Sequence, residues 1–212
     1  RSGYFGASVG TVVPLAYTEA SVDRRVMAQS KRKRTSRAEW FEAALRVLGE
    51  EGIAGIRVER LARDLGTSRS GFYWHFEDRN ELLQSLLDFW VRAQTETVFE
   101  KVDRADPSER LLKLMEILTL GEEARYEVAV RAWAGFDEMA AEVVRGTDKR
   151  RIEWLRRLFQ ELGFSGIEAE TRARLFVYYQ LAEPSVLWRE SKSKRREIIS
   201  LRYRLLTSPV AT

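Results

Sequence analysis

The sequence of 212 residues contains no cysteine and only one histidine, His75. Without cysteine the chain can form no disulfide, no thiolate metal site and no cysteine nucleophile. A single histidine has no partner for a histidine-based metal site or catalytic pair, and the sequence has no phosphate-binding glycine loop. We therefore expect no enzyme activity, no cofactor and no bound metal. The absence of cysteine also fits a reducing compartment, so a cytoplasmic localisation is predicted.

Long apolar runs are missing as well. No stretch approaches the ~20 apolar residues that a membrane-spanning helix requires. An apolar patch from Val9 to Tyr17 is broken by Pro14, and its flanks do not fit a signal peptide. The composition changes sharply at Met27. We hypothesise that Met27 is the natural start, and we predict that residues 1–30 form an extension or a disordered arm.

The charge is mildly and unevenly basic. Lysine and arginine exceed aspartate and glutamate by a net charge of +4, which suits a polyanionic partner. Five basic residues crowd together ahead of the first periodic segment: Lys31, Arg32, Lys33, Arg34 and Arg37. Such a cluster serves either as an arm that enters the minor groove of DNA or as a solvated tail.

Apolar residues recur at helical spacing almost everywhere, and strand signals are nearly absent, so the predicted fold class is all-α. At four positions a short polar residue precedes a glutamate by three, the pattern of a helix N-terminal capping box: Ser36, Asp78, Asp106 and Ser165. Three glycines follow periodic runs, as left-handed C-terminal caps do: Gly52, Gly66 and Gly163.

These signals predict a series of helices that divides into two domains. The helices cover residues 36–51, 58–65, 69–75, 79–101, a segment after Pro107, 123–134, 137–162 with a bend at Gly146, 166–182 and 194–207. The predicted domains are residues 31–80 and residues 81–212, and a family resemblance carried by residues 43–83 implies DNA binding by the first and effector binding and dimerisation by the second.

The helices at 58–65 and 69–75 are joined by Gly66, Thr67 and Ser68. This spacing fits a helix–turn–helix, whose second helix enters the major groove, and it fits an ordinary helical hairpin equally well. The composition of the second helix favours DNA. Small and donor-bearing residues gather on one side of it, and Phe72 and Phe76 anchor the other side.

The run from Ala43 through Leu83 resembles the DNA-binding domain of the tetracycline-repressor (TetR) family. The matching residues are Ala44-Leu45, Gly49, Gly52, Leu61-Ala62, Leu65-Gly66, Ser68, Phe72-Tyr73-Trp74-His75-Phe76, Arg79 and Leu82-Leu83. One position departs from the family. Arg57 stands where a threonine usually opens the second helix, so the usual hydroxyl cap is missing, although Arg57 itself can reach a phosphate.

The resemblance implies a role for each matching residue. Arg69, Ser70 and Tyr73 are the expected groove readers, and Tyr73, His75 and Arg79 the expected phosphate contacts. For His75, packing at the end of the helix is an equal alternative. The predicted DNA-binding set is Arg57, Ser68, Arg69, Ser70, Tyr73, His75 and Arg79.

Aromatic residues recur through the C-terminal part, and most of them are expected to be plain core. The resemblance implies that some line an internal cavity for an apolar or aromatic effector, and the predicted ligand-binding residues are Tyr126, Trp133, Phe136 and Trp154. The helices at 166–182 and 194–207 are predicted to form a homodimer contact. The expected stripe on the first holds Ala169, Ala173, Phe176, Val177 and Gln180, and that on the second Ile198, Leu201, Leu205 and Leu206. Burial of these stripes within one subunit is the alternative.

Together these expectations describe a ligand-responsive transcriptional repressor. Its dimer binds an inverted-repeat operator, and a small molecule among the C-terminal helices releases it by changing the separation of the two recognition helices. Two alternatives are a DNA-binding regulator without an effector, and a helical enzyme or adaptor in which the hairpin is incidental. The enzyme alternative lacks catalytic equipment in the sequence.

Overall fold

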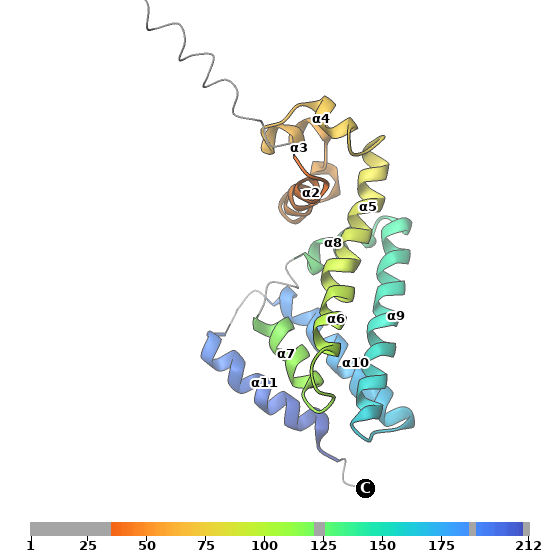
Figure 1. Ribbon diagram of the computed structural model, residues 1–212, viewed down its shortest axis with the longest axis vertical. Coiled ribbons are helices and arrows are strands. Elements are labelled where there is room, and N and C mark those ends of the chain that lie inside the picture. The colour runs from red at the N-terminus through yellow and green to blue at the C-terminus, as the bar shows by residue number, and fades with distance from the viewer. Residues whose placement is uncertain (1–34, 121–125, 187–189, 210–212) are drawn as a thin grey trace, which may run out of the picture. The chain divides into compact units, whose positions relative to one another are not determined.

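The helices lie close to where the apolar spacing places them. The computed structural model describes residues 35–120, 126–186 and 190–209, and these residues contain helices and no strand (Figure 1). The predicted arm at residues 1–30 and the basic residues 31–34 lie outside the described residues. Within the described part the all-α prediction is confirmed.

The elements follow one another with short connections. The α-helices are α2 (Arg37–Glu51), α3 (Val58–Asp64), α4 (Arg69–Tyr73), α5 (Arg79–Val91), α6 (Thr97–Asp103), α7 (Arg110–Leu120), α8 (Glu127–Ala134), α9 (Glu138–Glu161), α10 (Gly166–Ala182) and α11 (Lys192–Thr207). A π-helical turn, Arg92–Glu96, joins α5 to α6 without a break in the helical backbone. Short 3-10 helices cover Ile53–Gly55 and Glu183–Ser185.

Two of the four predicted helix N-terminal caps are confirmed. Ser36 forms a complete capping box with Glu39, and the Asp78 side chain accepts a hydrogen bond from the backbone N–H of Glu81. Ser165 precedes α10 but makes no side-chain cap hydrogen bond. The prediction at Asp106 is wrong, because residues 107–109 form a turn and α7 begins only at Arg110.

The glycine signals are reliable. Gly52, Gly66 and Gly163 all adopt positive φ just after a helix. Gly52 combines a φ of 72° with a ψ of −174°, which lies outside the left-handed helical region. By contrast, α9 continues through Gly146 without interruption from Glu138 to Glu161.

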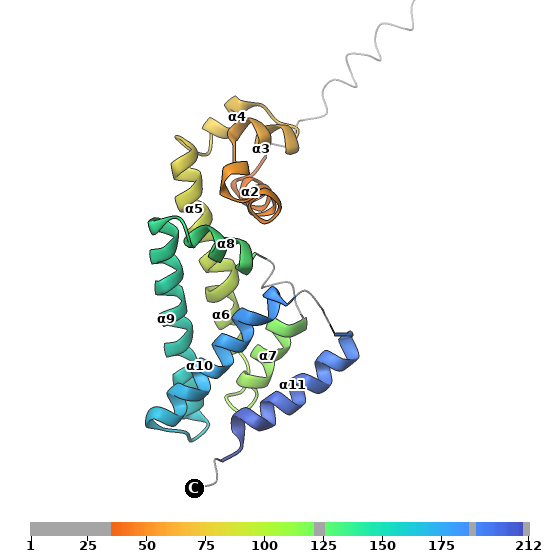
Figure 2. The same ribbon diagram turned by 180° about the vertical axis from the view of Figure 1, so that it is seen from behind.

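The buried residues form two hydrophobic cores. The first is built by α2, α3, α4 and α5 together with α8 and the beginning of α9. The second is built by α6, α7, the end of α9, α10 and α11. The continuous α5–α6 rod runs from one core to the other, and both views show it between the α2–α4 group and the remaining helices (Figures 1 and 2).

The two cores do not follow the predicted domain boundary at residue 80. That boundary falls inside α5, whose buried residues Leu82, Leu83, Leu86 and Trp90 belong to the first core. Trp133 of α8 also packs in the first core, beside the helices of the helix–turn–helix. The two predicted domains therefore share packed side chains.

Among the described residues, none of the helices combines the length and apolar character needed to cross a membrane.

Gly55 occupies a site where a side chain does not fit. A Cβ atom at this position would lie 2.7 Å from the Cβ of Glu51 and 3.0 Å from the Cγ1 of Val47. We expect Gly55→Ala to lower the free energy of unfolding by about 1–3 kcal/mol, the usual cost of overpacking.

The matched control for Gly55→Ala is Gly49→Ala. Gly49 lies in α2, and a Cβ there would meet nothing within 4 Å. Replacing a helical glycine by alanine should stabilise the protein by roughly 0.5–1 kcal/mol. Urea denaturation of both variants measures the two effects. Equal stability of the two variants would contradict the steric account of Gly55.

Candidate nucleic-acid interface and ligand pocket

The turn between α3 and α4 has the geometry that a helix–turn–helix needs. Gly66 adopts a φ of 62°. The N–H of Thr67 donates to the carbonyl of Ala62 at 2.9 Å, closing the six-residue ring of a Schellman motif. Ser68 then caps α4 by accepting a hydrogen bond from the N–H of Gly71 at 3.3 Å. The turn predicted from Gly66-Thr67-Ser68 is thus confirmed.

Aromatic packing fixes one side of α4. Phe72 and Phe76 are almost completely buried, and Phe72 meets the ring of Trp40 edge-on with the centroids 5.4 Å apart. Tyr73, the last residue of α4, and Trp74, its C-terminal cap, are 53% and 77% exposed. A five-residue helix is therefore held rigidly on one side while its other side faces solvent.

The predicted groove readers share this exposed side. Arg69, Ser70 and Tyr73 are all exposed. The Ser70 hydroxyl lies 2.8 Å from that of Ser68, and Arg69 pairs with Glu59 of α3 at 3.2 Å across an exposed surface. Because an exposed ion pair is worth little, Arg69 can leave Glu59 for another anionic group at low cost.

His75 and Arg79, two other residues of the predicted DNA-binding set, form hydrogen bonds within the protein. His75 donates from Nε2 to the carbonyl of Thr35 at 2.7 Å. Arg79 donates from Nε to the carbonyl of Ile56 at 2.7 Å and from Nη2 to the carbonyl of Ile53 at 2.8 Å. Arg79 thus ties α5 to the segment before α3. Arg57, at the N-terminal cap of α3, is exposed and makes no side-chain cap hydrogen bond.

Arg37 was grouped with the basic cluster, but the structure gives it a role within the fold. Its guanidinium donates to the carbonyl of His75 at 3.1 Å and to Ser85 at 2.7 Å, and it pairs with Glu81 at 3.1 Å. It also lies 4.6 Å from the centre of the Phe76 ring. Sequence patterning did not identify these contacts, because they join residues 38 to 48 positions apart.

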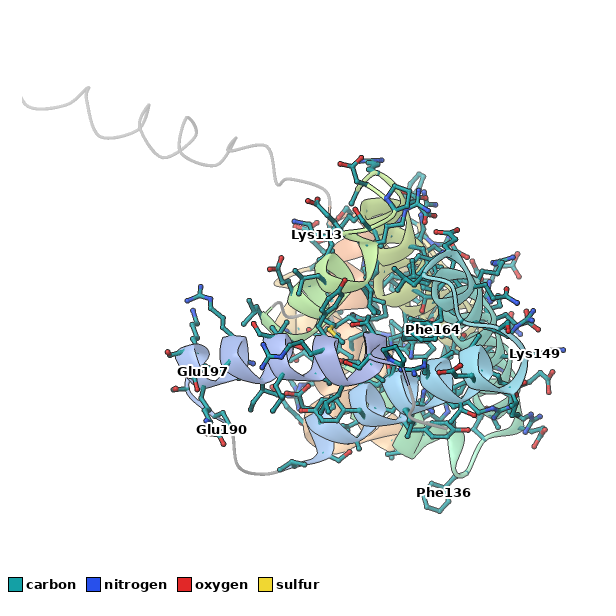
Figure 3. The ribbon with its side chains drawn as sticks, turned by 90° about the horizontal axis from the view of Figure 1, so that it is seen from below. Lys113, Phe136, Lys149, Phe164, Glu190 and Glu197 are labelled. Carbon is teal, nitrogen blue, oxygen red and sulfur yellow. The ribbon has the colours of Figure 1, made fainter. Side chains whose placement is uncertain are left out.

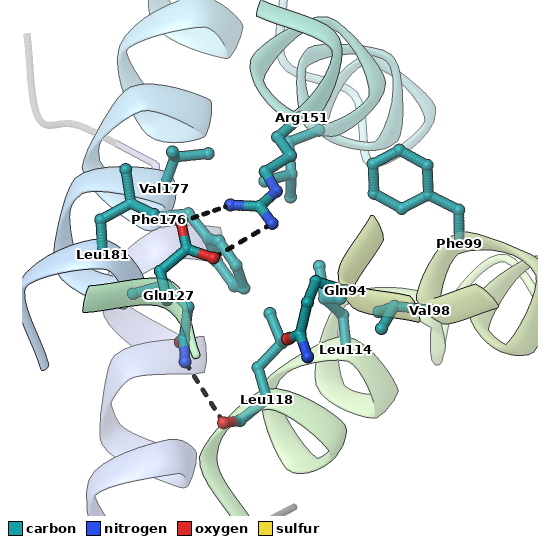
Figure 4. A pocket seen from close by; sticks show the side chains of 12 residues that line it. Gln94, Val98, Phe99, Leu114, Leu118, Glu127, Arg151, Phe176, Val177 and Leu181 are labelled. Carbon is teal, nitrogen blue, oxygen red and sulfur yellow. Dashed lines mark hydrogen bonds and ion pairs between the residues drawn. The ribbon is translucent and has the colours of Figure 1, made fainter. Parts of the chain in front are cut away.

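A pocket opens among the helices around the second core (Figure 4). It comprises about 530 Å³ of space between side chains, part of which is open to solvent. Most of its lining is apolar, and four polar residues contribute: Gln94, Glu127, Arg151 and Gln180.

An ion-pair network forms one wall of the pocket. The Glu127 carboxylate, 3% exposed, accepts hydrogen bonds from Arg151 at 3.0 and 3.3 Å and from Arg131 at 2.8 Å. Arg131 also pairs bidentately with Asp148. Arg151 donates from Nε to the hydroxyl of Thr95, in the π-helical turn, at 2.9 Å. The network, defined as Thr95, Glu127, Arg131, Asp148 and Arg151, joins the α5–α6 rod to α8 and α9.

The network changes the pKa of Arg131. Burial is the largest single influence on Arg131 and acts to lower the pKa of its guanidinium. The hydrogen bonds and charges of Asp148 and Glu127 act in the opposite direction, and together they raise the pKa of Arg131 above its ordinary value.

The pocket lining includes none of the four predicted ligand residues. Tyr126 and Trp133 are buried in the first core, where the Tyr126 hydroxyl donates to Glu42 of α2 at 3.3 Å. Trp154 stacks on Phe99, a lining residue, with ring centres 4.3 Å apart. Phe136 is 94% exposed and points away from the helices (Figure 3), so it lines no pocket here. The predicted ligand residues are all aromatic, whereas six of the eight apolar lining residues are aliphatic.

The stripe predicted on α10 for the dimer is wrong as an exposed surface. Its five residues, Ala169, Ala173, Phe176, Val177 and Gln180, are buried within the chain's own second core or against it. On α11, Leu206 is buried, whereas Leu201 and Leu205 are 50% and 67% exposed. The apolar residues that α10 does expose are Ile167, Leu175, Tyr178 and Tyr179.

No cluster of three or more histidine, aspartate or glutamate side chains in the described residues is arranged to hold a metal ion.

Residues 41–86 match the sequence profile of the family described as "Bacterial regulatory proteins, tetR family". The chain is 33% identical to the HTH-type transcriptional regulator TtgR of Pseudomonas putida over 82 residues, which are 38% of this chain and 39% of TtgR. The chain therefore spans about two fifths of the length of this curated relative.

Solved structures agree over most of the chain. A TetR transcription regulator from Haloarcula marismortui superposes with a TM-score of 0.62 at 19% identity, covering 79% of this chain and 94% of that one. AibR, in complex with isovaleryl coenzyme A and operator DNA, superposes with a TM-score of 0.63 at 18% identity, covering 82% and 99%. These likenesses establish the fold. The profile match shows that residues 41–86 are similar to the sequence shared by the tetR family of bacterial regulatory proteins.

Proposed function

We propose that the protein is a dimeric transcriptional repressor that binds an inverted-repeat operator and is released from it by a small molecule. The observation that carries this proposal is α4, a helix fixed by buried Phe72 and Phe76 that presents Arg69, Ser70 and Tyr73 to solvent. A recognition helix needs a rigid backbone and free donors at once. AibR, which has the same fold, was solved with operator DNA.

DNA binding is the first step to establish. Selection of bound fragments from genomic DNA, followed by footprinting, identifies the operator. Its affinity should fall steeply with salt concentration, because phosphate contacts release counterions. A failure to select any specific sequence would contradict the proposed function.

Tyr73→Ala should weaken operator binding by roughly 1–3 kcal/mol, the value of one good contact in the groove or to the backbone. The fold should survive, because the Tyr73 side chain is 53% exposed. The control is Phe136→Ala, which removes an exposed aromatic ring from the turn between α8 and α9. Gel-shift titrations compare the two, and equal affinities would remove Tyr73 from the interface.

Arg79 and Arg57 are both predicted to contact DNA. Substitution of Arg79 is expected to affect stability, whereas substitution of Arg57 is expected to affect DNA binding. Arg79→Met leaves the carbonyls of Ile53 and Ile56 without their partner. We expect the free energy of unfolding to fall by about 1–3 kcal/mol.

Arg57→Met is the matched control for Arg79→Met. The Arg57 side chain is exposed, so stability should change by less than about 0.5 kcal/mol. Loss of a phosphate contact should instead lower the salt dependence of operator binding by about one ion. Denaturation and salt titration measure the two quantities, and a large loss of stability in Arg57→Met would contradict this division.

We propose that α10 and α11 pair with the same helices of a second subunit through the apolar residues that remain exposed. On α10 these are Leu175, Tyr178 and Tyr179, and on α11 they are Leu201 and Leu205. Tyr179 and α11 are neighbours, since the Arg202 guanidinium lies 4.2 Å from the centre of the Tyr179 ring. A twofold dimer would set two α4 helices about 34–36 Å apart, one turn of DNA.

The double substitution Leu201→Glu with Leu205→Glu should convert the dimer to a monomer, because it places charges in an apolar contact. Sedimentation equilibrium gives the mass, and the gel shift should show weakened operator binding. Phe136→Glu adds the same charge to an exposed site outside α10 and α11 and should remain dimeric. A double variant that stays dimeric would place the contact elsewhere.

The path from the pocket to the DNA-binding helices supports ligand control. The pocket touches the π-helical turn through Gln94, and that turn continues directly into α5. Glu127 lies in the pocket lining, and its neighbour Tyr126 contacts α2 through Glu42. A ligand that favours one arrangement of these elements would change the placement of α4 and thereby the affinity for the operator.

A further inference from the structure

Among the described residues, the polar part of the pocket divides into groups that already have partners and one group that has none. The three guanidinium nitrogens of Arg151 all face partners, with Nε on Thr95 and the two Nη atoms on Glu127. Gln180 donates to the carbonyl of Leu118 at 3.3 Å and accepts from Arg202 at 3.4 Å. Gln94 is half-buried in the lining, and no side-chain hydrogen bond of its amide is present within the described part of the chain.

The charges at this wall are balanced. The ion-pair network contains two carboxylates, Glu127 and Asp148, and two guanidinium groups, Arg131 and Arg151. The rest of the lining is apolar, formed by Val98, Phe99, Leu114, Leu118, Leu155, Phe176, Val177 and Leu181. An ionised ligand would therefore lose its hydration without gaining an unpaired counter-charge, which disfavours binding strongly.

The Gln94 amide sits on the element that connects the pocket to the DNA-binding helices. Gln94 is the central residue of the π-helical turn Arg92–Glu96. The close view shows its side chain directed toward Leu114 and Leu118 across the pocket (Figure 4). Turns of this kind occur frequently at functional sites, because the extra residue re-aims a side chain.

We propose that the effector is an uncharged, predominantly apolar molecule with one hydrogen-bonding group, such as a hydroxyl or a carbonyl, that binds the Gln94 amide. This inference rests on the proposed function, because it assigns the ligand class of the same regulatory pocket. The apolar body packs on the aliphatic lining, and the polar group satisfies Gln94. Contact with Gln94 places the ligand directly on the π-helical turn.

The test is a matched series of probes with one chain length and three charges: octan-1-ol, octanoate and octylammonium. At pH 7.5 the last two are ionised, since carboxyl groups titrate near ~4 and amines above ~10. Isothermal titration calorimetry on the full chain should show octan-1-ol binding at least about tenfold more tightly than either ion, because only the ions bury an unpaired charge. Tighter binding of octanoate or octylammonium would overturn the proposed class.

Two substitutions at Gln94 test the contact itself. Gln94→Leu should weaken the binding of octan-1-ol by about three- to tenfold, because one neutral hydrogen bond is lost. Gln160→Leu is the same change at an exposed position of α9 and should leave the affinity unchanged. Gln94→Glu adds a negative charge to the pocket and should make octylammonium the preferred probe. Unaltered probe preference in Gln94→Glu, with an unchanged melting temperature, would remove Gln94 from the site.

Operator-binding and probe-binding measurements on the same protein distinguish a failure of this inference from a failure of the proposed function. Specific operator binding without any binding of octan-1-ol would overturn the ligand class and leave the DNA-binding regulator standing. The predicted probe order without any effect on the operator complex would uphold the ligand class and contradict ligand-controlled repression.

Discussion

Glu127 is a carboxylate buried at the meeting point of three elements, and the arrangement of the C-terminal helices depends on its pairing. A buried charge without a partner is strongly destabilising. Arg131 reaches Glu127 from the next turn of α8, and Arg151 reaches it from α9. Arg151 then binds Thr95 in the π-helical turn. Separation of α8 from α9 would remove Arg151 from Glu127, and separation of the α5–α6 rod from α9 would remove the hydrogen bond between Arg151 and Thr95, so the relative positions of these elements are closely specified.

Because of these pairings, α8 contributes both to the pocket wall and to the core that supports the helix–turn–helix. α8 belongs to the first hydrophobic core, with Trp133 buried among the residues that also support α2 and α4. The same helix supplies Glu127 to the pocket. A change at the pocket wall therefore acts on a helix already packed against the helix–turn–helix. The α5–α6 rod offers a second route, since its residues enter both cores.

Much of this architecture was readable from the sequence because it depends on local chemistry. The capping box at Ser36, the positive-φ glycine at Gly66 and the ring contact between Phe72 and Phe76 all join residues a few positions apart. Helix boundaries and the turn of the helix–turn–helix follow from such signals. The exposed residues of α4 follow too, since apolar periodicity determines which side is buried.

The errors arise where partners are distant in the sequence. Periodicity showed that α10 carries an apolar stripe, but not whether α7 and α9 of the same chain or a second subunit covers it. The hydrogen-bond partners of Arg79 within the chain, the carbonyls of Ile53 and Ile56, were likewise not predicted, because they belong to a backbone segment 23 to 26 residues earlier. Aromatic residues likewise suggested a pocket at Trp133 and Phe136. The described pocket has Glu127, Arg151 and Gln94 in its lining, and only three-dimensional packing brings these residues together.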